Sequence, residues 1–196
     1  MIVKRFIKGP IQCNNYVIID DVSKEAVLID CSEPDDDIID YVKKQGAVLK
    51  YILLTHAHFD HILGVNYYRK NFNVPVFLHH SDDNLLHQIG FYVDGAEEVE
   101  VDNLFSDDAE FKLGDNTIKV IRTAGHTEGS VCFLIGYMLF SGDTLFYGTY
   151  GRTDLPGGSD AKMMDSLRLL FTLDDNTAVY PGHGDTTSVG AEKVRY

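Results

Sequence analysis

Short apolar runs, bounded by polar or glycine-containing turns, divide the chain into segments typical of β-strands. In the first half they predict strands at 3–7, 16–20, 26–30, 48–54 and 76–78. In the second half they predict strands at 111–113, 117–123, 130–135, 137–140 and 178–180. Longer stretches predict helices at about 34–46, 62–72, 81–89 and 160–171, with Ser81 and Ser159 as N-caps of the last two.

The two halves of the chain have the same broad plan, in which strands lead into a helix. Two β-rich halves with intervening helices predict two packed sheets with helices on their outer faces, an α+β sandwich. The sequence has 196 residues and no convincing linker or low-complexity segment. We therefore expect one domain, spanning 1–196.

Composition narrows the classes of function. The net charge of −13, without a basic patch, argues against a nucleic-acid partner. No apolar run of about 18 residues and no secretory signal are present, so we expect no membrane association and a cytoplasmic location. The cysteines, Cys13, Cys31 and Cys132, are odd in number and widely spaced, which favours small buried residues in a reducing compartment.

Side chains of the metal-binding types gather after the apolar run 51–54. His56, His58, Asp60 and His61 lie within six positions. In an extended segment, side chains two apart point the same way, so His56 and His58 can reach one cation from the same side. Asp60 and His61 lie where the chain turns into a helix. These residue types build zinc sites, and their density argues against chance clustering.

Three later residues share this setting, each at a predicted strand end beside glycine or small residues: His126, Asp143 and His183. Glycine lets the backbone turn tightly and approach a metal closely. Together with the first cluster, the chain offers five imidazoles and two carboxylates, enough for two cations with a water between them. Asp143 has two oxygens and could bridge the cations.

Other polar clusters have structural interpretations. The carboxylates at 35–37 follow Pro34 and suit the first turn of a helix, where the helix dipole favours negative charge. The three remaining histidines of the middle segment are predicted to be surface or helix-face residues: His79, His80 and His87.

The order of the motifs Thr-His-Ala-His-Phe-Asp-His, Gly-His-Thr, Gly-Asp-Thr and Pro-Gly-His-Gly resembles the metallo-β-lactamase-fold hydrolases. It is closest to their glyoxalase II-like (hydroxyacylglutathione hydrolase-like) branch, over nearly the whole chain. The resemblance implies an αββα sandwich. It also implies the ligand sets: His56, His58 and His126 for a first metal, Asp60, His61 and His183 for a second, and Asp143 for both.

The same resemblance implies a mechanism. One or two Zn²⁺ ions, with iron or manganese as substitutes, would supply a metal-bound hydroxide. Asp60 would orient the attacking water or shuttle a proton, and Asp143 would hold the ions. Asp30 matches an early aspartate of the family that orients a metal ligand by a hydrogen bond. Because glyoxalase II relatives cleave thioesters, we expect a small thioester substrate such as S-lactoylglutathione.

The sequence also departs from glyoxalase II. That family continues, after the motif matching His183, into a helical region that helps to bind glutathione, whereas this sequence ends 13 residues later. We therefore expect substrate contacts from Arg152, Tyr147 and Tyr150, or from a partner subunit in a homo-oligomer. Arg152 falls where glyoxalase II has a basic glutathione-binding residue, but an ion pair with Asp154 on the surface is an equal interpretation.

Three further readings of the motifs stay open. Persulfide dioxygenases share this fold and a Gly-Arg-Thr-Asp segment, and they bind one iron through two histidines and an aspartate, here His56, His126 and Asp143. The Pro-Gly-His-Gly motif is more similar to the hydrolases. A lactonase, another ester hydrolase or a β-lactam hydrolase would use the same fold, and a purely metal-binding module is the third class.

Overall fold

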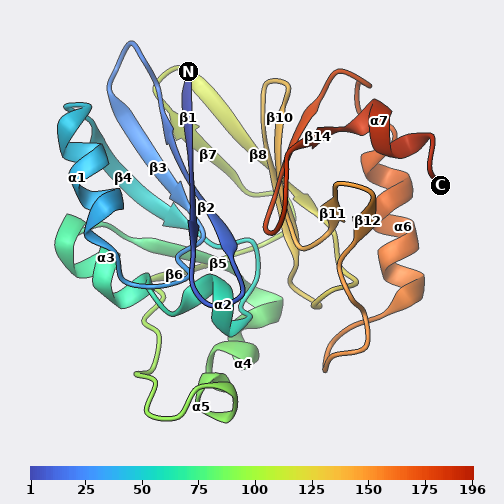
Figure 1. Cartoon of the computed structure of the whole chain (residues 1–196), viewed down its shortest axis with the longest axis horizontal. Coiled ribbons are helices and arrows are strands. Elements are labelled where there is room, and N and C mark those ends of the chain that lie inside the picture. Colours follow the sequence, from blue (N-terminus) through green and yellow to red (C-terminus); the bar gives the residue numbers. More distant parts are fainter.

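Two six-stranded sheets form the centre of the computed structural model, which describes all 196 residues (Figure 1). In spatial order, the first sheet consists of β1 (Ile2–Lys8), β2 (Cys13–Ile19), β3 (Glu25–Ile29), β4 (Val48–Leu53), β5 (Val76–His79) and β6 (Asn103–Phe105). The second consists of β14 (Thr187–Ser188), β13 (Ala178–Pro181), β10 (Met138–Gly142), β9 (Val131–Ile135), β8 (Asn116–Arg122) and β7 (Glu110–Leu113).

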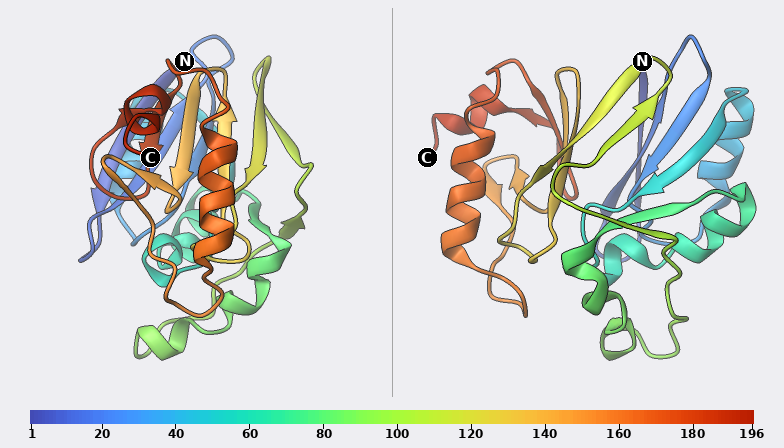
Figure 2. Two further views of the ribbon diagram at one scale, coloured as in Figure 1. Left: turned by 90° about the vertical axis from the view of Figure 1, so that its right-hand side faces the viewer. Right: turned by 180° about the vertical axis from the view of Figure 1, so that it is seen from behind.

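Helices cover the outer faces of both sheets, and a small hairpin joins β11 (Leu145–Phe146) to β12 (Thr149–Tyr150). The helices are α1 (Asp36–Lys44), α2 (Phe59–Ile62), α3 (Val65–Phe72), the 3₁₀ turn η1 (His80–Asp82), α4 (Asp83–Leu86), α5 (Ile89–Tyr92), α6 (Asp160–Leu170) and α7 (Val189–Lys193). Figure 2 shows α6 on the side of the molecule opposite to α1 and α3.

The layers follow from the two-residue period of the strands. In β2, Val17 and Ile19 pack into a cluster with α1 and α3, whereas Tyr16 and Ile18 pack between the sheets against Phe133 of β9. A third cluster packs the apolar face of α6 against the outer face of the second sheet. The predicted αββα sandwich is therefore confirmed.

The strand directions bring several chain segments to the same edge of the sandwich. In the first sheet β3, β4 and β5 are parallel, and in the second sheet β10 and β13 are parallel. Segments that follow parallel strands leave the sheet at the same edge. Residues far apart in the sequence can therefore meet there.

Most predicted elements are present within one or two residues of their predicted bounds. Asp35 caps α1 by accepting a hydrogen bond from the backbone N–H of Asp37, and Ser159 caps α6 by accepting one from Lys162. The strands β6, β11, β12 and β14 and the helix α7 were not predicted, because each is short and carries little periodic signal. Every helix is too short or too polar to span a bilayer.

Two helix predictions need correction. The helix predicted at 62–72 begins later, as α3 at Val65, and the short helix α2 ends at Ile62 before it. The turn between them contains Gly64, whose backbone lies so close to Glu33 that a Cβ there would be 2.6 Å from the Glu33 carbonyl oxygen. The helix predicted at 81–89 consists of η1, α4 and α5, and the cap before it is His79, not Ser81. Nδ1 of His79 accepts the backbone N–H of Ser81.

Candidate metal centre

The residues predicted as metal ligands lie just after strands. Four of them lie between the end of β4 and the end of α2, and the other three follow β8, β10 and β13. They are His56, His58, Asp60, His61, His126, Asp143 and His183. The structure brings all seven together in one cluster, in two groups that share Asp143.

The first group consists of His56, His58 and His126, whose nearest ring nitrogens all lie within 4.8 Å of one another. Nδ1 of His58 is 2.8 Å from Nε2 of His126. Nδ1 of His126 lies 2.7 Å from the carbonyl oxygen of Arg152, so it carries the proton and leaves Nε2 free to bind. Nε2 of His56 is buried and has no hydrogen-bond partner. The group therefore offers three nitrogens to one cation.

The second group consists of Asp60, His61 and His183. Nε2 of His61 lies 3.3 Å from Nε2 of His183 and 3.7 Å from Oδ2 of Asp60. The same Asp60 oxygen is 3.1 Å from Nε2 of His183. Donor atoms at these separations can surround one ion, because metal–ligand distances near 2 Å place neighbouring donors roughly 3 to 4 Å apart.

Asp143 reaches both groups. Its Oδ2 lies 3.4 Å from Nε2 of His126 in the first group and 3.6 Å from Nε2 of His183 in the second. Its Oδ1 lies 3.3 Å from Nε2 of His61, yet this buried oxygen makes no hydrogen bond of good geometry. A carboxylate in this place can bridge two ions, as the sequence predicts.

Asp30 contacts a ligand of the second group, His61, on the ring nitrogen that does not face the other ligands. Its Oδ2 lies 2.8 Å from Nδ1 of His61 and also accepts a hydrogen bond from the Thr55 hydroxyl at 2.8 Å. Its Oδ1 accepts the backbone N–H of Thr55 at 2.8 Å. A carboxylate at Nδ1 fixes the tautomer in which Nε2 of His61 has a free lone pair.

Burial and neighbouring charges hold the first group ready for a cation. Burial, together with the nearby imidazoles, lowers the pKa of His56 well below its usual value and that of His58 to about 4. Burial raises the pKa of Asp143, but the positive field of His61 and of the other imidazoles outweighs it, so the pKa is lowered overall. Neutral imidazoles and ionised carboxylates are the forms that bind metals.

The donor set fits divalent first-row metals. It contains imidazole nitrogens and carboxylate oxygens, which suit zinc, iron and manganese alike. The backbone of Gly182 lies close to two of the ligands, because a Cβ there would be 2.3 Å from Oδ1 of Asp143 and 2.8 Å from Cε1 of His61. Only glycine fits at this position. The cluster can therefore hold divalent metals, and the residue types do not select one of them.

Strand β2 holds the segment that carries His183. The side-chain amide of Asn14 donates to the carbonyl oxygens of Pro181 and Gly184, on either side of His183. The Tyr16 hydroxyl also donates to the Pro181 oxygen, at 2.7 Å. Sequence reasoning missed both residues, because their partners are backbone atoms more than 160 positions away.

Cys13 is a neighbour of the second group. Its sulfur lies 3.6 Å from Nδ1 and 3.7 Å from Nε2 of His61, so it packs against the ring face and does not lie along a nitrogen lone pair. Burial raises the pKa of the Cys13 thiol to about 12. Cys13, Cys31 and Cys132 are all free and buried, as predicted.

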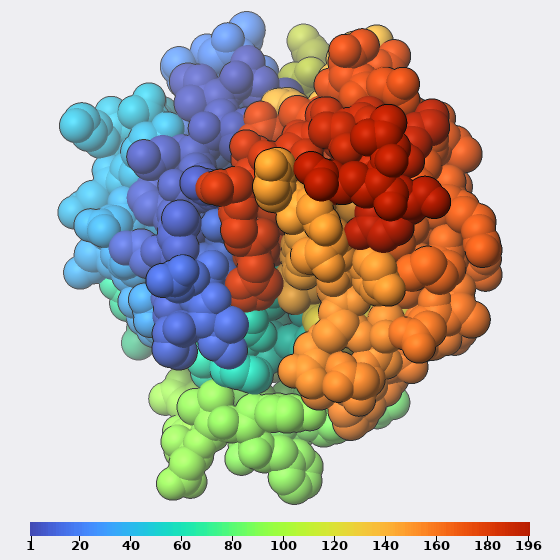
Figure 3. Space-filling view, turned by 45° about the vertical axis from the view of Figure 1, so that its right-hand side comes forward, coloured from blue at the N-terminus to red at the C-terminus, as the bar shows by residue number.

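A cavity of about 360 Å³ opens over the ligands. Its polar lining includes His58 and His126 of the first group and Asp60 and His183 of the second, with Asp143 between them. Its rim is apolar, apart from Arg152, and is formed by Ile11, Phe59, Tyr92, Phe146 and Leu155. In Figure 3 the β1–β2 turn, the segment around α5 and the orange segment after β12 adjoin on one face of the molecule.

The residues predicted to contact substrate have different surroundings. Arg152 lines the cavity, and its guanidinium forms two hydrogen bonds with Asp154, at 2.7 and 2.8 Å. The surface ion pair is therefore present, and substrate binding by Arg152 stays a prediction. Tyr147 lies under the guanidinium of Arg195, and Tyr150 contacts Tyr196. Neither tyrosine lines the cavity, so their role in substrate binding stays a prediction.

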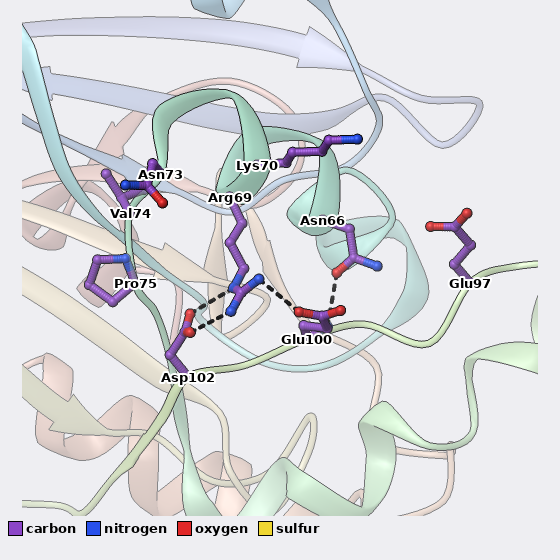
Figure 4. Close-up of a pocket in the computed structure, with 9 residues that line it drawn as sticks. All are labelled: Asn66, Arg69, Lys70, Asn73, Val74, Pro75, Glu97, Glu100 and Asp102. Atoms are coloured by element: carbon purple, nitrogen blue, oxygen red, sulfur yellow. Dashed lines mark hydrogen bonds and ion pairs between the residues drawn. The ribbon is translucent and has the colours of Figure 1, made fainter.

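A larger hollow of the surface, about 630 Å³, lies elsewhere (Figure 4). Its centre is Arg69 of α3, whose guanidinium binds both oxygens of Asp102 and one of Glu100. Asn66 accepts the backbone N–H of Glu100. These groups satisfy one another and tie α3 to the segment before β6, so this hollow has a structural role.

The histidines outside the cluster are only partly as predicted. His80 and His87 are exposed, as expected. His79 is not a surface residue: it is fully buried at the end of β5, and Nε2 lies 2.8 Å from Asp107. The strand β5 includes His79, one residue beyond the predicted strand at 76–78.

Comparisons with known proteins agree with this geometry. A model of the metallo-beta-lactamase superfamily matches residues 9–183. The probable metallo-hydrolase YqgX of Bacillus subtilis is 36% identical, over 97% of this chain and 93% of the relative. The hydroxyacylglutathione hydrolase GloC of Haemophilus influenzae is 30% identical, over 91% of this chain and 89% of the relative.

Solved structures show the same similarity. The BLEG-1 B3 metallo-beta-lactamase superposes with a TM-score of 0.89 at 34% identity, covering 98% of this chain and 97% of that one. TTHA1623 in a di-iron-bound form gives 0.88 at 31%, covering 97% of each chain. ETHE1 from Myxococcus xanthus gives 0.81 at 32%, covering 98% of this chain and 82% of that one. The chain therefore belongs to the metallo-beta-lactamase superfamily, as a metallo-hydrolase with that superfamily's fold.

Proposed function

We propose that this protein hydrolyses small thioesters, such as S-lactoylglutathione, and that the seven-residue cluster holds one or two divalent ions for this reaction. Zinc is the metal that we favour. The observation that carries the proposal is the cavity of about 360 Å³ whose floor contains ligands of both groups and whose rim is mostly apolar. A substrate carbonyl can reach the cluster, while the non-reacting parts of the substrate contact the rim. The similarity to a hydroxyacylglutathione hydrolase supports a thioester as the substrate class.

A divalent ion bound here would lower the pKa of a coordinated water towards about 7 and polarise the substrate carbonyl. The chain's own residues supply the remaining chemistry. Asp60 lines the cavity and lies 3.1 Å from Nε2 of His183, so its carboxylate can orient a water or accept its proton. Asp143 sets the separation of the two ligand groups, because its oxygens face both.

Substrate contacts come from the rim. Phe59 stacks on Tyr92, with ring planes 14° apart, and this pair forms an apolar wall beside the ligands. Arg152 is the one cation on the rim and can bind a carboxylate if it exchanges Asp154 for the substrate. Tyr147 and Tyr150, or a partner subunit in a homo-oligomer, would add contacts outside the cavity. With few polar contacts to the leaving thiol, we expect broad selectivity among small thioesters.

Persulfide dioxygenation is the second candidate. Its support is the Gly-Arg-Thr-Asp segment at 151–154 and the proximity of His126 to Asp143, at 3.4 Å, which with His56 would form the three-residue iron site of that class. Two features favour the hydrolase: the second ligand group, which a single iron does not need, and the hydroxyacylglutathione hydrolase among the relatives.

A substrate panel tests the proposal. The metal-loaded protein is assayed with S-lactoylglutathione, a simple acyl thioester, a lactone and a β-lactam, and free thiol or ring opening is followed. We expect comparable kcat/KM values for the two thioesters and far lower ones for the lactone and the β-lactam. A lactone or β-lactam turned over faster than both thioesters would contradict the assigned substrate class.

A further inference from the structure

Asp82 joins the two loops that carry the first ligand group. It is the last residue of η1, after β5 of the first sheet, and its side chain is buried. Its Oδ2 accepts the backbone N–H of Ala57, which lies between His56 and His58, at 3.0 Å. The same oxygen accepts the hydroxyl of Thr127, next to His126, at 2.8 Å.

The other oxygen of Asp82 extends the contact into the second sheet's loop. Oδ1 accepts the backbone N–H of Gly129 at 2.7 Å. The backbone of Gly129 comes so close that a Cβ there would lie 2.7 Å from Cγ of Asp82. One carboxylate thus connects the loop after β4 with the loop between β8 and β9, which belong to different sheets.

The three contacts require two acceptor oxygens. Two of the donors are backbone N–H groups, which cannot reverse their role. An asparagine would have to turn its amide NH₂ group towards either Ala57 or Gly129, and a donor would then face a donor. Burial raises the pKa of Asp82, and the hydrogen bonds from Thr127, Gly129 and Ala57 oppose that rise. The positions of these donors therefore favour a carboxylate over an amide at residue 82.

We propose that Asp82 is a positioning residue for the first metal: it holds the loop of His56 and His58 at a fixed distance from the loop of His126. Asp82 touches none of the three imidazoles and acts through Ala57, Thr127 and Gly129. The inference rests on the metal site of the proposed function and not on its thioester substrate. Residues that orient metal ligands typically change metal affinity by about 10- to 100-fold when they are altered.

The test compares Asp82→Asn with Asp102→Asn. Asp102 is the matched control, because it also accepts three hydrogen bonds, two from Arg69 and one from the backbone N–H of Val76, but lies in the hollow of Figure 4, away from the cluster. Each variant is titrated with Co²⁺ in competition with a chromogenic chelator, and its visible spectrum and thermal unfolding are recorded. The titrations are repeated with His183→Ala added, which removes a ligand of the second group.

We expect Asp82→Asn to weaken Co²⁺ binding by about 10- to 100-fold, in both backgrounds, and to change the visible spectrum. Asp102→Asn should lower the unfolding temperature and leave binding and spectrum as in the wild type. Equal Co²⁺ affinity and spectra in all three proteins would overturn the positioning role. If the wild type itself binds no Co²⁺, the metal site fails, and the inference fails with it for that separate reason.

A second pair of variants serves if Asp82→Asn does not fold. Thr127→Val removes one of the three donors, and Thr127→Ser keeps the hydroxyl. We expect Thr127→Val to weaken Co²⁺ binding and Thr127→Ser to restore it towards the wild-type value. Equal, wild-type binding by both variants would contradict the link from Asp82 to the His126 loop.

Discussion

The carboxylate of Asp30 lies 2.8 Å from Nδ1 of His61, and Asp30 holds this contact with a backbone φ of +59°. A non-glycine residue in the left-handed region typically costs about 1 to 3 kcal/mol, and such strain is kept where the surroundings fix it. Here Thr55 fixes it with a backbone and a hydroxyl hydrogen bond to the same carboxylate. The strained residue directs Nε2 of His61 towards the second ligand group.

Asp30→Asn should therefore impair the second site. Because the Thr55 N–H requires an oxygen, the new NH₂ group would face Nδ1 of His61 and force the proton onto Nε2, the atom that must bind the ion. We expect about 10- to 100-fold weaker binding of one ion per chain, measured by calorimetric titration, and an unchanged first ion.

Asp35→Asn is the control for that experiment, because asparagine caps a helix as well as aspartate does. Asp35 caps α1 and forms an ion pair with Lys8, and it contacts none of the seven ligands. An Asp30→Asn protein that binds both ions as tightly as the control would show that the tautomer of His61 is not set by Asp30.

His58→Ala and Asp143→Ala should each lose metal and activity together, since each removes a residue whose donor atoms face the cluster. Metal content by elemental analysis and thiol release from S-lactoylglutathione are measured on the same samples. Full metal occupancy in both variants would refute their assignment as ligands.

His183→Ala separates the two groups. The first group does not contain His183, and its nitrogens keep their contacts without it. We therefore expect the variant to retain about one ion per chain and part of its turnover. Loss of all metal would mean that the two sites bind as one unit through Asp143.

Arg152→Ala and Asp154→Ala form an opposed pair. Removing Arg152 takes away the cation that can bind a substrate carboxylate, so it should raise KM for carboxylate-bearing thioesters more than for uncharged ones. Asp154 competes with such a substrate, because it occupies the guanidinium of Arg152. Removing Asp154 should lower KM for the same substrates. Steady-state kinetics with one substrate of each type decide this, and equal KM changes for both types would assign Arg152 to the surface ion pair alone.

The layers of the fold could be predicted from the sequence, because apolar periodicity reports which face a strand buries. Val17 and Tyr16 are adjacent in the sequence and pack on opposite faces of the same sheet, as the two-residue period requires. Short elements such as β6 were not predictable, because three residues that pair at a sheet edge carry no period of their own.

The candidate ligands could be named from the sequence because their residue types and glycine neighbours are local signals. Asp82 could not, since it contacts backbone N–H groups 25 and 47 positions away. The cavity rim was missed for a similar reason: Phe59 and Tyr92 become neighbours only after folding. Tyr147 was named because it lies near Arg152 in the sequence, yet the residue before it, Phe146 at the end of β11, is the one that lines the cavity.

The most direct test of the account is a paired assay on one preparation. Anaerobically, metal-loaded protein is given S-lactoylglutathione and free thiol is measured. In air, the iron-loaded protein is given glutathione persulfide and oxygen uptake is measured. The hydrolase account predicts thiol release without oxygen and no oxygen uptake with the persulfide. Rapid oxygen uptake with no thiol release would contradict it and identify a persulfide dioxygenase.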